Sequence, residues 1–135
     1  MGTLGGPNAA AYAINVNGLI VGNSQTASDA DHVFSYSNGA MTDLGAFNID
    51  TVPAAVNDSG VFVGQTYGVT GSGSTFNDAF VYANGSFQDL NSLIPAGFGW
   101  TLTDATSIND AGQILVDAVN NTNGNTHTFL LTPTS

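Results

Sequence analysis

The decapeptide Ala-Ile-Asn-Val-Asn-Gly-Leu-Ile-Val-Gly at residues 13–22 decides how this chain folds, because close variants of it occur twice more. Residues 55–64 read Ala-Val-Asn-Asp-Ser-Gly-Val-Phe-Val-Gly, and residues 107–116 read Ser-Ile-Asn-Asp-Ala-Gly-Gln-Ile-Leu-Val. All three copies keep Asn at the third position and Gly at the sixth. The period is roughly 40 to 50 residues, which is typical of repeat architectures. The sequence therefore predicts three repeated structural units.

Two further segments follow the decapeptide in a fixed order. An aromatic segment recurs as His-Val-Phe-Ser-Tyr at residues 32–36, Asp-Ala-Phe-Val-Tyr at 78–82 and His-Thr-Phe-Leu-Leu at 127–131. The next segment occurs only twice, as Asn-Gly-Ala-Met-Thr-Asp-Leu-Gly at 38–45 and Asn-Gly-Ser-Phe-Gln-Asp-Leu-Asn at 84–91. We therefore predict one repeat domain over residues 1–135, with units at approximately 2–45, 46–94 and 95–135.

Each unit is predicted to contain four short antiparallel strands separated by tight turns. The Asn-x-x-Gly motifs and the Asn-Gly pairs predict hairpins, because Asn and Gly tolerate the positive φ of primed turns. The aromatic segments alternate and favour strands, and no helical periodicity is evident. Segments 23–31, 67–77 and 119–126 are rich in Gly, Ser, Thr and Asn and are predicted to be surface loops. The predicted fold is all-β, with three four-stranded units and the last strand of the third supplied by a neighbour.

Charge and cysteine content exclude several functions. The chain has ten Asp, no Glu, no Lys, no Arg and no Cys, with a formal net charge of −10 when its two histidines are neutral. Binding to nucleic acid and attraction to anionic lipid both depend on Lys or Arg, so we predict neither partner. The absence of Cys excludes disulfides, thiolate metal sites and cysteine nucleophiles. The longest apolar runs have only a few residues, whereas a transmembrane helix needs about 20.

Several of these segments together resemble the HAF family of extracellular repeats. The resemblance lies in Gly-Thr-Leu-Gly-Gly at residues 2–6, the decapeptide at 13–22, the His-x-Phe segments, Met-Thr-Asp-Leu-Gly at 41–45, Asp-Leu-Asn-Ser-Leu-Ile-Pro at 89–95 and Gly-Trp-Thr-Leu at 99–102. No copy of the aromatic segment reads His-Ala-Phe. The resemblance implies a secreted, extracellular protein built of blade-like, four-stranded sheets of the β-propeller kind. It implies no catalytic residues and no cofactor.

Three blades are fewer than the roughly four to eight that close a propeller. We therefore expect homo-oligomers of this chain, or neighbouring repeats of a longer chain, to complete the ring and to cover open strand edges. The alternative is a self-closed β-trefoil or β-prism, architectures that lectins often use. The fold alone would not establish sugar binding, so a glycan partner stays an alternative.

The histidines are the first candidates for catalysis. His32 and His127 occupy the same position of the aromatic segment, and Asp78 replaces them in the second unit. A serine nucleophile would need a base positioned for it alone, whereas a position that recurs in the repeats favours a structural role. We predict that these imidazoles cap or hydrogen-bond a strand end.

The carboxylates offer two pairs for acid–base hydrolysis of glycosides, Asp29 with Asp31 and Asp104 with Asp110. Asp110, however, matches Asp58 of the second unit, and Asp is a favoured turn residue because its side chain bonds nearby backbone amides. Asp43 and Asp89 match each other in the same way. We therefore predict turn chemistry and no catalytic residues.

No metal site or cofactor is predicted either, although so acidic a chain is compatible with weak calcium binding. The run Asp-Ala-Asp-His at residues 29–32 begins like an oxygen-ligand loop, but the Gly and Glu of an EF-hand are missing. Trp100 and Phe98 could form an aromatic platform for a sugar ring, but we favour core packing.

The predicted function is a non-catalytic extracellular structural or interaction module that self-associates through incomplete β-sheet units. A carbohydrate-binding, lectin-like module is the alternative, followed by an Asp-dependent glycosidase.

Overall fold

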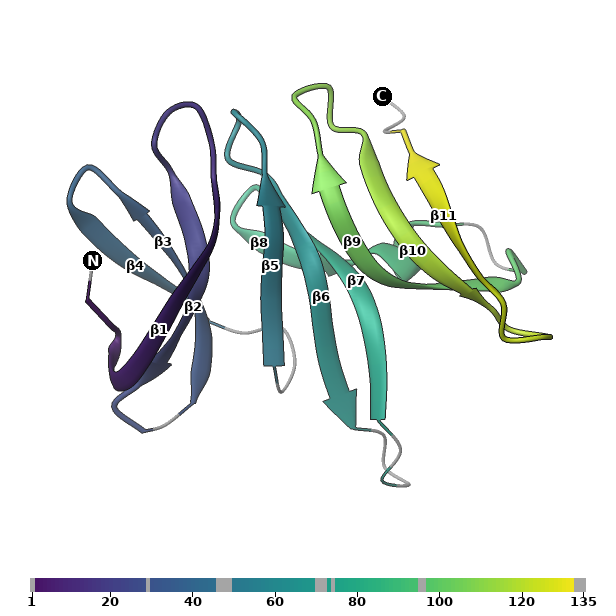
Figure 1. Ribbon diagram of the computed structural model, residues 1–135, viewed down its shortest axis with the longest axis horizontal. Helices are drawn as coiled ribbons and strands as arrows, with labels where there is room; N and C mark the ends of the chain where they lie inside the picture. Colours follow the sequence, from purple (N-terminus) through teal and green to yellow (C-terminus); the bar gives the residue numbers. More distant parts are fainter. Residues whose placement is uncertain are drawn as a thin grey trace.

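The computed structural model describes residues 2–28, 30–45, 50–69, 73, 75–94 and 97–132. Within these residues the chain is all-β, as predicted, and its strands form three antiparallel sheets (Figure 1). The one helical element that they contain is a short 3-10 helix, η1 (Leu90–Leu93). No helix in this part of the chain is long and apolar enough to cross a membrane.

In each sheet, strands that are consecutive in the sequence lie next to each other. The first sheet consists of β1 (Gly5–Ile14), β2 (Ile20–Thr26), β3 (Asp31–Ser37) and β4 (Ala40–Gly45). The second consists of β5 (Asp50–Val56), β6 (Phe62–Val69), β7 (Thr75–Ala83) and β8 (Ser86–Asp89). The third consists of β9 (Trp100–Ile108), β10 (Ile114–Asn120) and β11 (Thr126–Leu131). Four strands are thus confirmed for the first two units. The third sheet has three strands within the described residues, as expected for a unit that lacks the Asn-Gly segment.

The tight turns form in two different ways. Between β3 and β4 and between β7 and β8, Asn38 and Asn84 have φ of 53° and 55° and each precedes a Gly of positive φ, as the Asn-Gly pairs predicted. They are the two non-glycine residues with positive φ in the described part of the chain. Asn15 of the first decapeptide is not in the left-handed region, whereas Gly18 has φ of 83°. The prediction that this Asn supplies a positive φ is therefore wrong, and its side chain explains its position instead.

The strands extend into segments that were predicted to be loops. Strand β2 continues to Thr26 and β6 to Val69, so much of 23–31 and 67–77 is sheet. The polar residues there still pair across antiparallel strands, because the backbone ladder does not require apolar side chains. In 119–126, β10 ends at Asn120 and β11 begins at Thr126, and residues 121–125 between them form the predicted loop. Of the Gly-Ser run at 71–74, three residues lie outside the described part of the chain.

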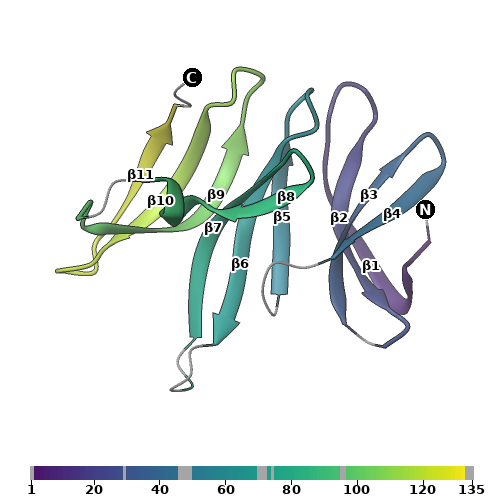
Figure 2. The same cartoon turned by 180° about the vertical axis from the view of Figure 1, so that it is seen from behind.

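The three sheets stack in chain order, and the second lies between the first and the third (Figures 1 and 2). We call the side of a sheet that faces the following sheet its front face and the opposite side its rear face. Side chains alternate between the two faces along each strand. In the second sheet, the neighbouring pair Val63 and Val81 belongs to the front face, and Phe62 and Tyr82 belong to the rear face.

Two apolar cores lie between successive sheets, and burial of their side chains is the main force that holds the stack together. The core between the first and second sheets consists of Val21, Val33, Phe62 and Phe80, with Ala13, Leu44, Val56, Tyr82 and Phe87 packed against them. The core between the second and third sheets consists of Val63, Ala79, Val81, Leu90, Leu102, Ala105, Ile114, Val116 and Ala118, with Trp100, Ile108, Phe129 and Leu131 among the residues at its margin.

Two glycines allow the first two strands of a sheet to pass beneath an aromatic ring. A Cβ on Gly64 would lie 2.0 Å from the Val52 carbonyl oxygen and 2.9 Å from a ring carbon of Phe80. Gly22 has the same surroundings in the first sheet, with Phe34 as the ring. The third sheet carries Val116 at this position, so the close approach belongs to the first two units only.

Candidate functional site

The first Asn of each decapeptide caps its own turn through its side-chain oxygen. Asn15 Oδ1 accepts hydrogen bonds from the backbone N–H groups of Asn17 and Leu19, at 2.9 and 3.0 Å. Asn57 Oδ1 accepts from the two equivalent N–H groups in the second unit, both at 3.0 Å. Asn109 Oδ1 accepts from Gln113 N–H at 2.9 Å. One recurring side chain therefore closes the turn before β2, β6 and β10.

The amide nitrogen of the same Asn side chain reaches the next unit. Asn15 Nδ2 donates to the Asn57 carbonyl oxygen at 3.0 Å, and Asn57 Nδ2 donates to the Asn109 carbonyl oxygen at 3.1 Å. Each of these Asn residues therefore closes its own turn with one side-chain atom and holds the following sheet with the other. The primary amide of Asn carries its acceptor and its donors on separate atoms of one short side chain, which explains why Asn recurs.

The residue after each Asn adds a second link in the same direction. Val16 N–H donates to Asp58 Oδ1 at 3.2 Å, and Asp58 N–H donates to Asp110 Oδ1 at 2.8 Å. Asn17 Nδ2 also donates to the Asp58 carbonyl oxygen at 3.1 Å. We call the Asn and carboxylate links together the turn ladder. Asp58 and Asp110 were expected to bond nearby amides of their own turns, whereas their carboxylates accept from backbone N–H groups of the preceding unit.

The turn ladder is open at the third unit. Asn109 Nδ2 donates to Gln113 Oε1, at 2.9 Å, within its own exposed turn. Among the described residues, no acceptor is found for Asp110 N–H. At the other end, Val16 occupies the place where the later units carry Asp58 and Asp110, so the first unit lacks the carboxylate that accepts from a preceding unit.

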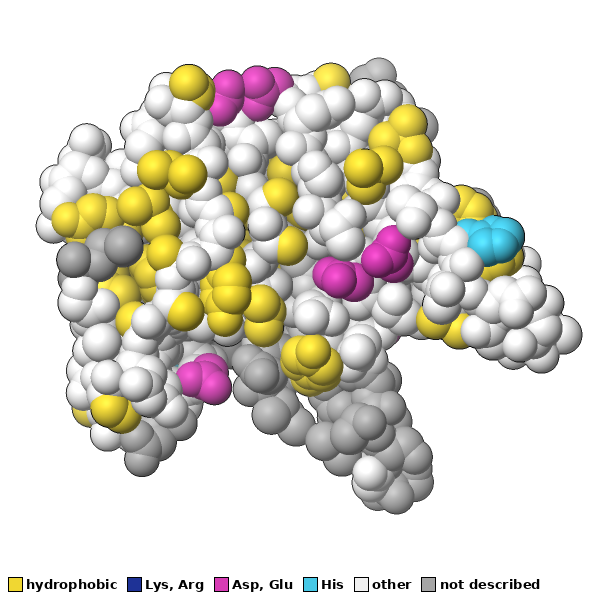
Figure 3. Space-filling model, in the orientation of Figure 1, with side chains coloured by type: hydrophobic (Ala, Val, Ile, Leu, Met, Phe, Trp, Pro, Cys, Tyr) yellow, Lys and Arg dark blue, Asp and Glu magenta, His cyan; other side chains and the backbone are white. Residues whose placement is uncertain are grey.

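The apolar faces are open at the same two ends. The Val63–Val81 pair of the front face is 0% and 8% exposed, whereas the equivalent Leu115–Leu130 pair of the third sheet is 42% and 57% exposed. On the rear face, Val56 packs into a core, whereas its equivalent Ile14 is 64% exposed. Figure 3 shows hydrophobic side chains gathered at the surface over the first sheet. Repeat positions that are buried inside the stack are therefore uncovered at its ends.

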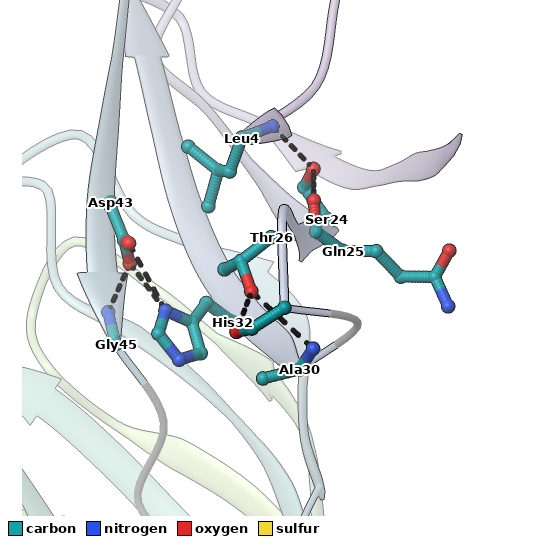
Figure 4. Close-up of polar contacts among 9 residues, drawn as sticks. Leu4, Ser24, Gln25, Thr26, Ala30, His32, Asp43 and Gly45 are labelled. Carbon is teal, nitrogen blue, oxygen red and sulfur yellow. Dashed lines mark hydrogen bonds and ion pairs between the residues drawn. The ribbon is translucent and has the colours of Figure 1, made fainter. Parts of the chain in front are cut away.

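The start of the aromatic segment forms a second recurring polar site. His32 Nδ1 lies 2.9 and 3.0 Å from the two carboxylate oxygens of Asp43, and Asp43 also accepts from Gly45 N–H at 2.8 Å (Figure 4). Slight burial raises the pKa of Asp43, but the bonds to His32 and Gly45 outweigh it and leave this pKa below its ordinary value. The hydrogen bond predicted for His32 therefore joins it to a carboxylate on the neighbouring strand β4.

The second unit places two carboxyl groups at this site. Asn91 Nδ2 donates to Asp78 at 3.4 Å and to Asp89 at 3.0 Å, and its other contacts are with the backbone of Leu102 in the third sheet. Partial burial of Asp78, together with its hydrogen bond to the negatively charged Asp89, raises the pKa of Asp78 to about 7. Asp78 therefore retains its proton up to about neutral pH. In the third unit, His127 instead packs beside Trp100, with ring centroids 4.9 Å apart.

Of the two carboxylate pairs that the sequence suggested for hydrolysis, Asp104 with Asp110 lies wholly within the described residues, and these two side chains have different partners. Asp104 lies opposite Asp117 on neighbouring strands, whereas Asp110 is in the turn ladder. Partial burial, with the charge of Asp117 beside it, raises the pKa of Asp104. These two residues line an open groove of about 390 Å³ together with Thr103, Thr126, His127 and Thr128. Asp31 is exposed, and its suggested partner Asp29 lies outside the described residues.

The described residues show neither a cluster of metal ligands nor an exposed aromatic platform at Trp100. No group of three or more His, Cys, Asp or Glu side chains that could hold a metal ion occurs among the described residues. Trp100 is partly buried and packs edge-to-face on Phe129, with centroids 5.2 Å apart, at the margin of the second core. Phe98 packs against the same Phe129 ring. These contacts agree with the expectation that Trp100 is a core residue.

Sequence reasoning missed the links between units. The signal was present, because Asn recurs at the third position of every decapeptide and Asp follows it in two of them. The repeated Asn predicts a local turn in each unit, but a polar residue that recurs in every unit can equally form hydrogen bonds between units. No family model, no curated protein and no solved structure matches the chain. The candidate functional site is therefore the pair of open ends of the turn ladder and of the two apolar faces.

Proposed function

We propose that this chain is a non-catalytic, extracellular structural module that self-associates through the open ends of its sheet stack. The observation that carries the proposal is that positions buried between sheets are exposed at the ends, as with Leu115 and Leu130 at one end and Ile14 at the other. Stacked repeats need a polar cap where the array stops, and an uncapped apolar face favours association. The extracellular location rests on the resemblance of the repeated segments to the HAF family.

The proposed assembly is a propeller-like ring completed by two chains. The second sheet separates the first from the third (Figures 1 and 2), whereas the outer units would meet in a self-closed β-trefoil or β-prism. Three sheets from each of two chains would give six, within the roughly four to eight blades of known propellers. Each contact between chains would then repeat a contact that already exists between units.

The bonding of four of the acidic side chains supports a structural role for them rather than hydrolysis. Asp43 and Asp89 accept backbone N–H bonds at 2.8 Å, and Asp58 and Asp110 accept bonds in the turn ladder. A glycosidase needs two carboxyl groups roughly 5 to 10 Å apart with room for the sugar between them. A carboxylate already committed to backbone amides is poorly placed for that work.

Light scattering coupled to size exclusion tests the proposal across protein concentration and salt. We expect a discrete species of twice the chain mass of 13.7 kDa. Because each chain has a formal charge of −10, association should strengthen as salt shortens the Debye length, which is about 10 Å at 0.1 M ionic strength. A monomer under all conditions would contradict self-association, and turnover of model glycosides that is lost on Asp substitution would contradict the non-catalytic role.

A further inference from the structure

We propose that two copies of this chain bind head to tail by extending the turn ladder, so that Asn109 Nδ2 of one copy donates to the Asn15 carbonyl oxygen of the other. The front face of the third sheet would then be covered by the rear face of the first sheet of the second copy. This inference rests on the proposed function and specifies the surface and the bonds through which it operates. The occupant is a second copy because the chain carries both halves of the contact.

The donor is available at the open end. Among the described residues, Asn109 Nδ2 bonds only the Gln113 side chain of its own turn, whereas the equivalent nitrogens of Asn15 and Asn57 hold the next unit. Exchanging the Gln113 partner for a backbone carbonyl keeps the number of hydrogen bonds constant. The side-chain nitrogen of Asn109 would then make the same bond as that of Asn57.

The acceptor also has a precedent inside the chain. The Asn57 carbonyl oxygen accepts two bonds, one from Gly60 N–H at 3.1 Å and one from Asn15 Nδ2 at 3.0 Å. The Asn15 carbonyl oxygen accepts only the first of these among the described residues, from Gly18 N–H at 3.1 Å. A carbonyl oxygen has two lone pairs, so Asn15 keeps one for a donor from a preceding unit.

The apolar faces match in the same register. On the rear face of the second sheet, Val56, Phe62 and Tyr82 are neighbours across β5, β6 and β7 and pack against the first sheet. On the rear face of the first sheet, the equivalent neighbours across β1, β2 and β3 are Ile14, Ile20 and Tyr36. The opposing surface inside the stack is aliphatic, and so is the exposed Leu115–Leu130 pair.

One link is missing from the contact between copies, and this makes the inference testable by a gain of affinity. Within the chain, the N–H of Val16 or Asp58 finds a carboxylate in the next unit. Asp110 N–H would instead meet Val16 of the second copy, which has no acceptor. Val16 is 80% exposed and contributes only its backbone N–H to the ladder, so its side chain can be replaced without disturbing the fold.

The experiment compares dimer dissociation constants by sedimentation equilibrium at about 0.15 M ionic strength, where the Debye length is about 8 Å. The ring of two copies contains this contact twice, so each substitution acts at both contacts. Val16→Asn supplies the missing acceptor without charge and should tighten the dimer about 25-fold, the effect of one hydrogen bond at each contact. Val16→Ala is the matched control and should not tighten it. Asn109→Asp keeps the turn-capping oxygen and removes the donor, and it should weaken the dimer about 100-fold, which is about tenfold at each contact.

A charge control accompanies the last variant. Asn123→Asp adds the same carboxylate in the turn between β10 and β11, at the other end of β10 from the ladder, and keeps an oxygen for Asn125 N–H. It should leave the dimer nearly unchanged. A dimer that responds to neither Val16→Asn nor Asn109→Asp would overturn the head-to-tail inference and leave self-association through the strand edges of β4 or β11. A chain that is monomeric at all concentrations would overturn both proposals.

Discussion

The Asn57 turn and the Asn109 turn share a sequence pattern and differ in what lies beyond them. Both cap the N–H groups of their own turn with the side-chain oxygen. Asn57 then donates its side-chain N–H to the third sheet, whereas Asn109 turns the same group back on Gln113. The comparison teaches that the side-chain oxygen of the repeated Asn closes the turn of its own unit, whereas its side-chain nitrogen binds the next unit. In the third unit this nitrogen has no following unit to bind among the described residues.

The cores differ between the first two units and the third. The rear face of the second sheet, which lines the core between the first and second sheets, is aromatic. There the Phe62 and Tyr82 rings stack with centroids 4.7 Å apart, and Phe87 packs edge-on against both. Phe80 completes this face above Gly64. The third unit replaces the glycine with Val116 and contributes mainly aliphatic side chains. The units are therefore alike in their turns and different in how tightly their first two strands approach.

The largest expected effect concerns this close approach. Gly64→Ala would place a Cβ 2.0 Å from the Val52 carbonyl oxygen, which forces β5 and β6 apart under the Phe80 ring. We expect the free energy of unfolding to fall by about 3 kcal/mol, as in severe overpacking, measured by urea denaturation. Gly22→Ala in the first sheet should have an effect of similar size. A loss below about 0.5 kcal/mol in both variants would show that the strands separate freely and that the glycines are not required.

The next effect separates the two Asn turns. Asn57→Asp keeps the capping oxygen but removes the donor to the third sheet and places a carboxylate against the Asn109 carbonyl oxygen. We expect a loss of about 2 kcal/mol, because a buried polar contact is replaced by repulsion. Asn109→Asp loses only a solvent-exposed bond to Gln113, so under monomeric conditions its loss should stay within about 0.5 kcal/mol. Equal losses would mean that the link between units adds nothing to stability.

The sequence predicted the all-β class and most turns, because their signals are local. Asn38 and Asn84 precede Gly in tight hairpins, and this pair alone favours a turn with positive φ. At the Asn15 turn the sequence predicts a positive φ for Asn15, whereas its side chain caps the turn and also bonds the second sheet. The pairing of Asp104 with Asp117 also depends on strand register, which a bulge in β9 shifts. Contacts of this kind are set by stacking and register, so composition and spacing alone did not predict them.

The smallest expected effect compares the polar sites of the first two units and depends on pH. The pKa of Asp78 is raised from 3.8 to about 7 in the folded chain, so between these values the folded state binds a proton that the unfolded state does not. The stability that this group contributes is therefore complete below pH 3.8 and is lost as the pH rises through about 7. Asp43, whose pKa is lowered, contributes stability that is lost as the pH falls instead.

Asp78→Asn should remove the loss of stability that the unmodified chain shows as the pH rises through about 7. We expect this variant to be about 1 kcal/mol more stable than the unmodified chain near pH 8, a value reduced from the full linkage energy because the site is half-exposed. Near pH 3 the two chains should be equally stable, since Asp78 is then protonated in both states. Asp43→Asn is the matched variant, and it should be less stable than the unmodified chain at neutral pH because it gives up the bond to His32. The test is the urea midpoint of each of the three chains measured from pH 3 to pH 8. If the three midpoints change with pH in the same way, neither Asp78 nor Asp43 couples its protonation to folding.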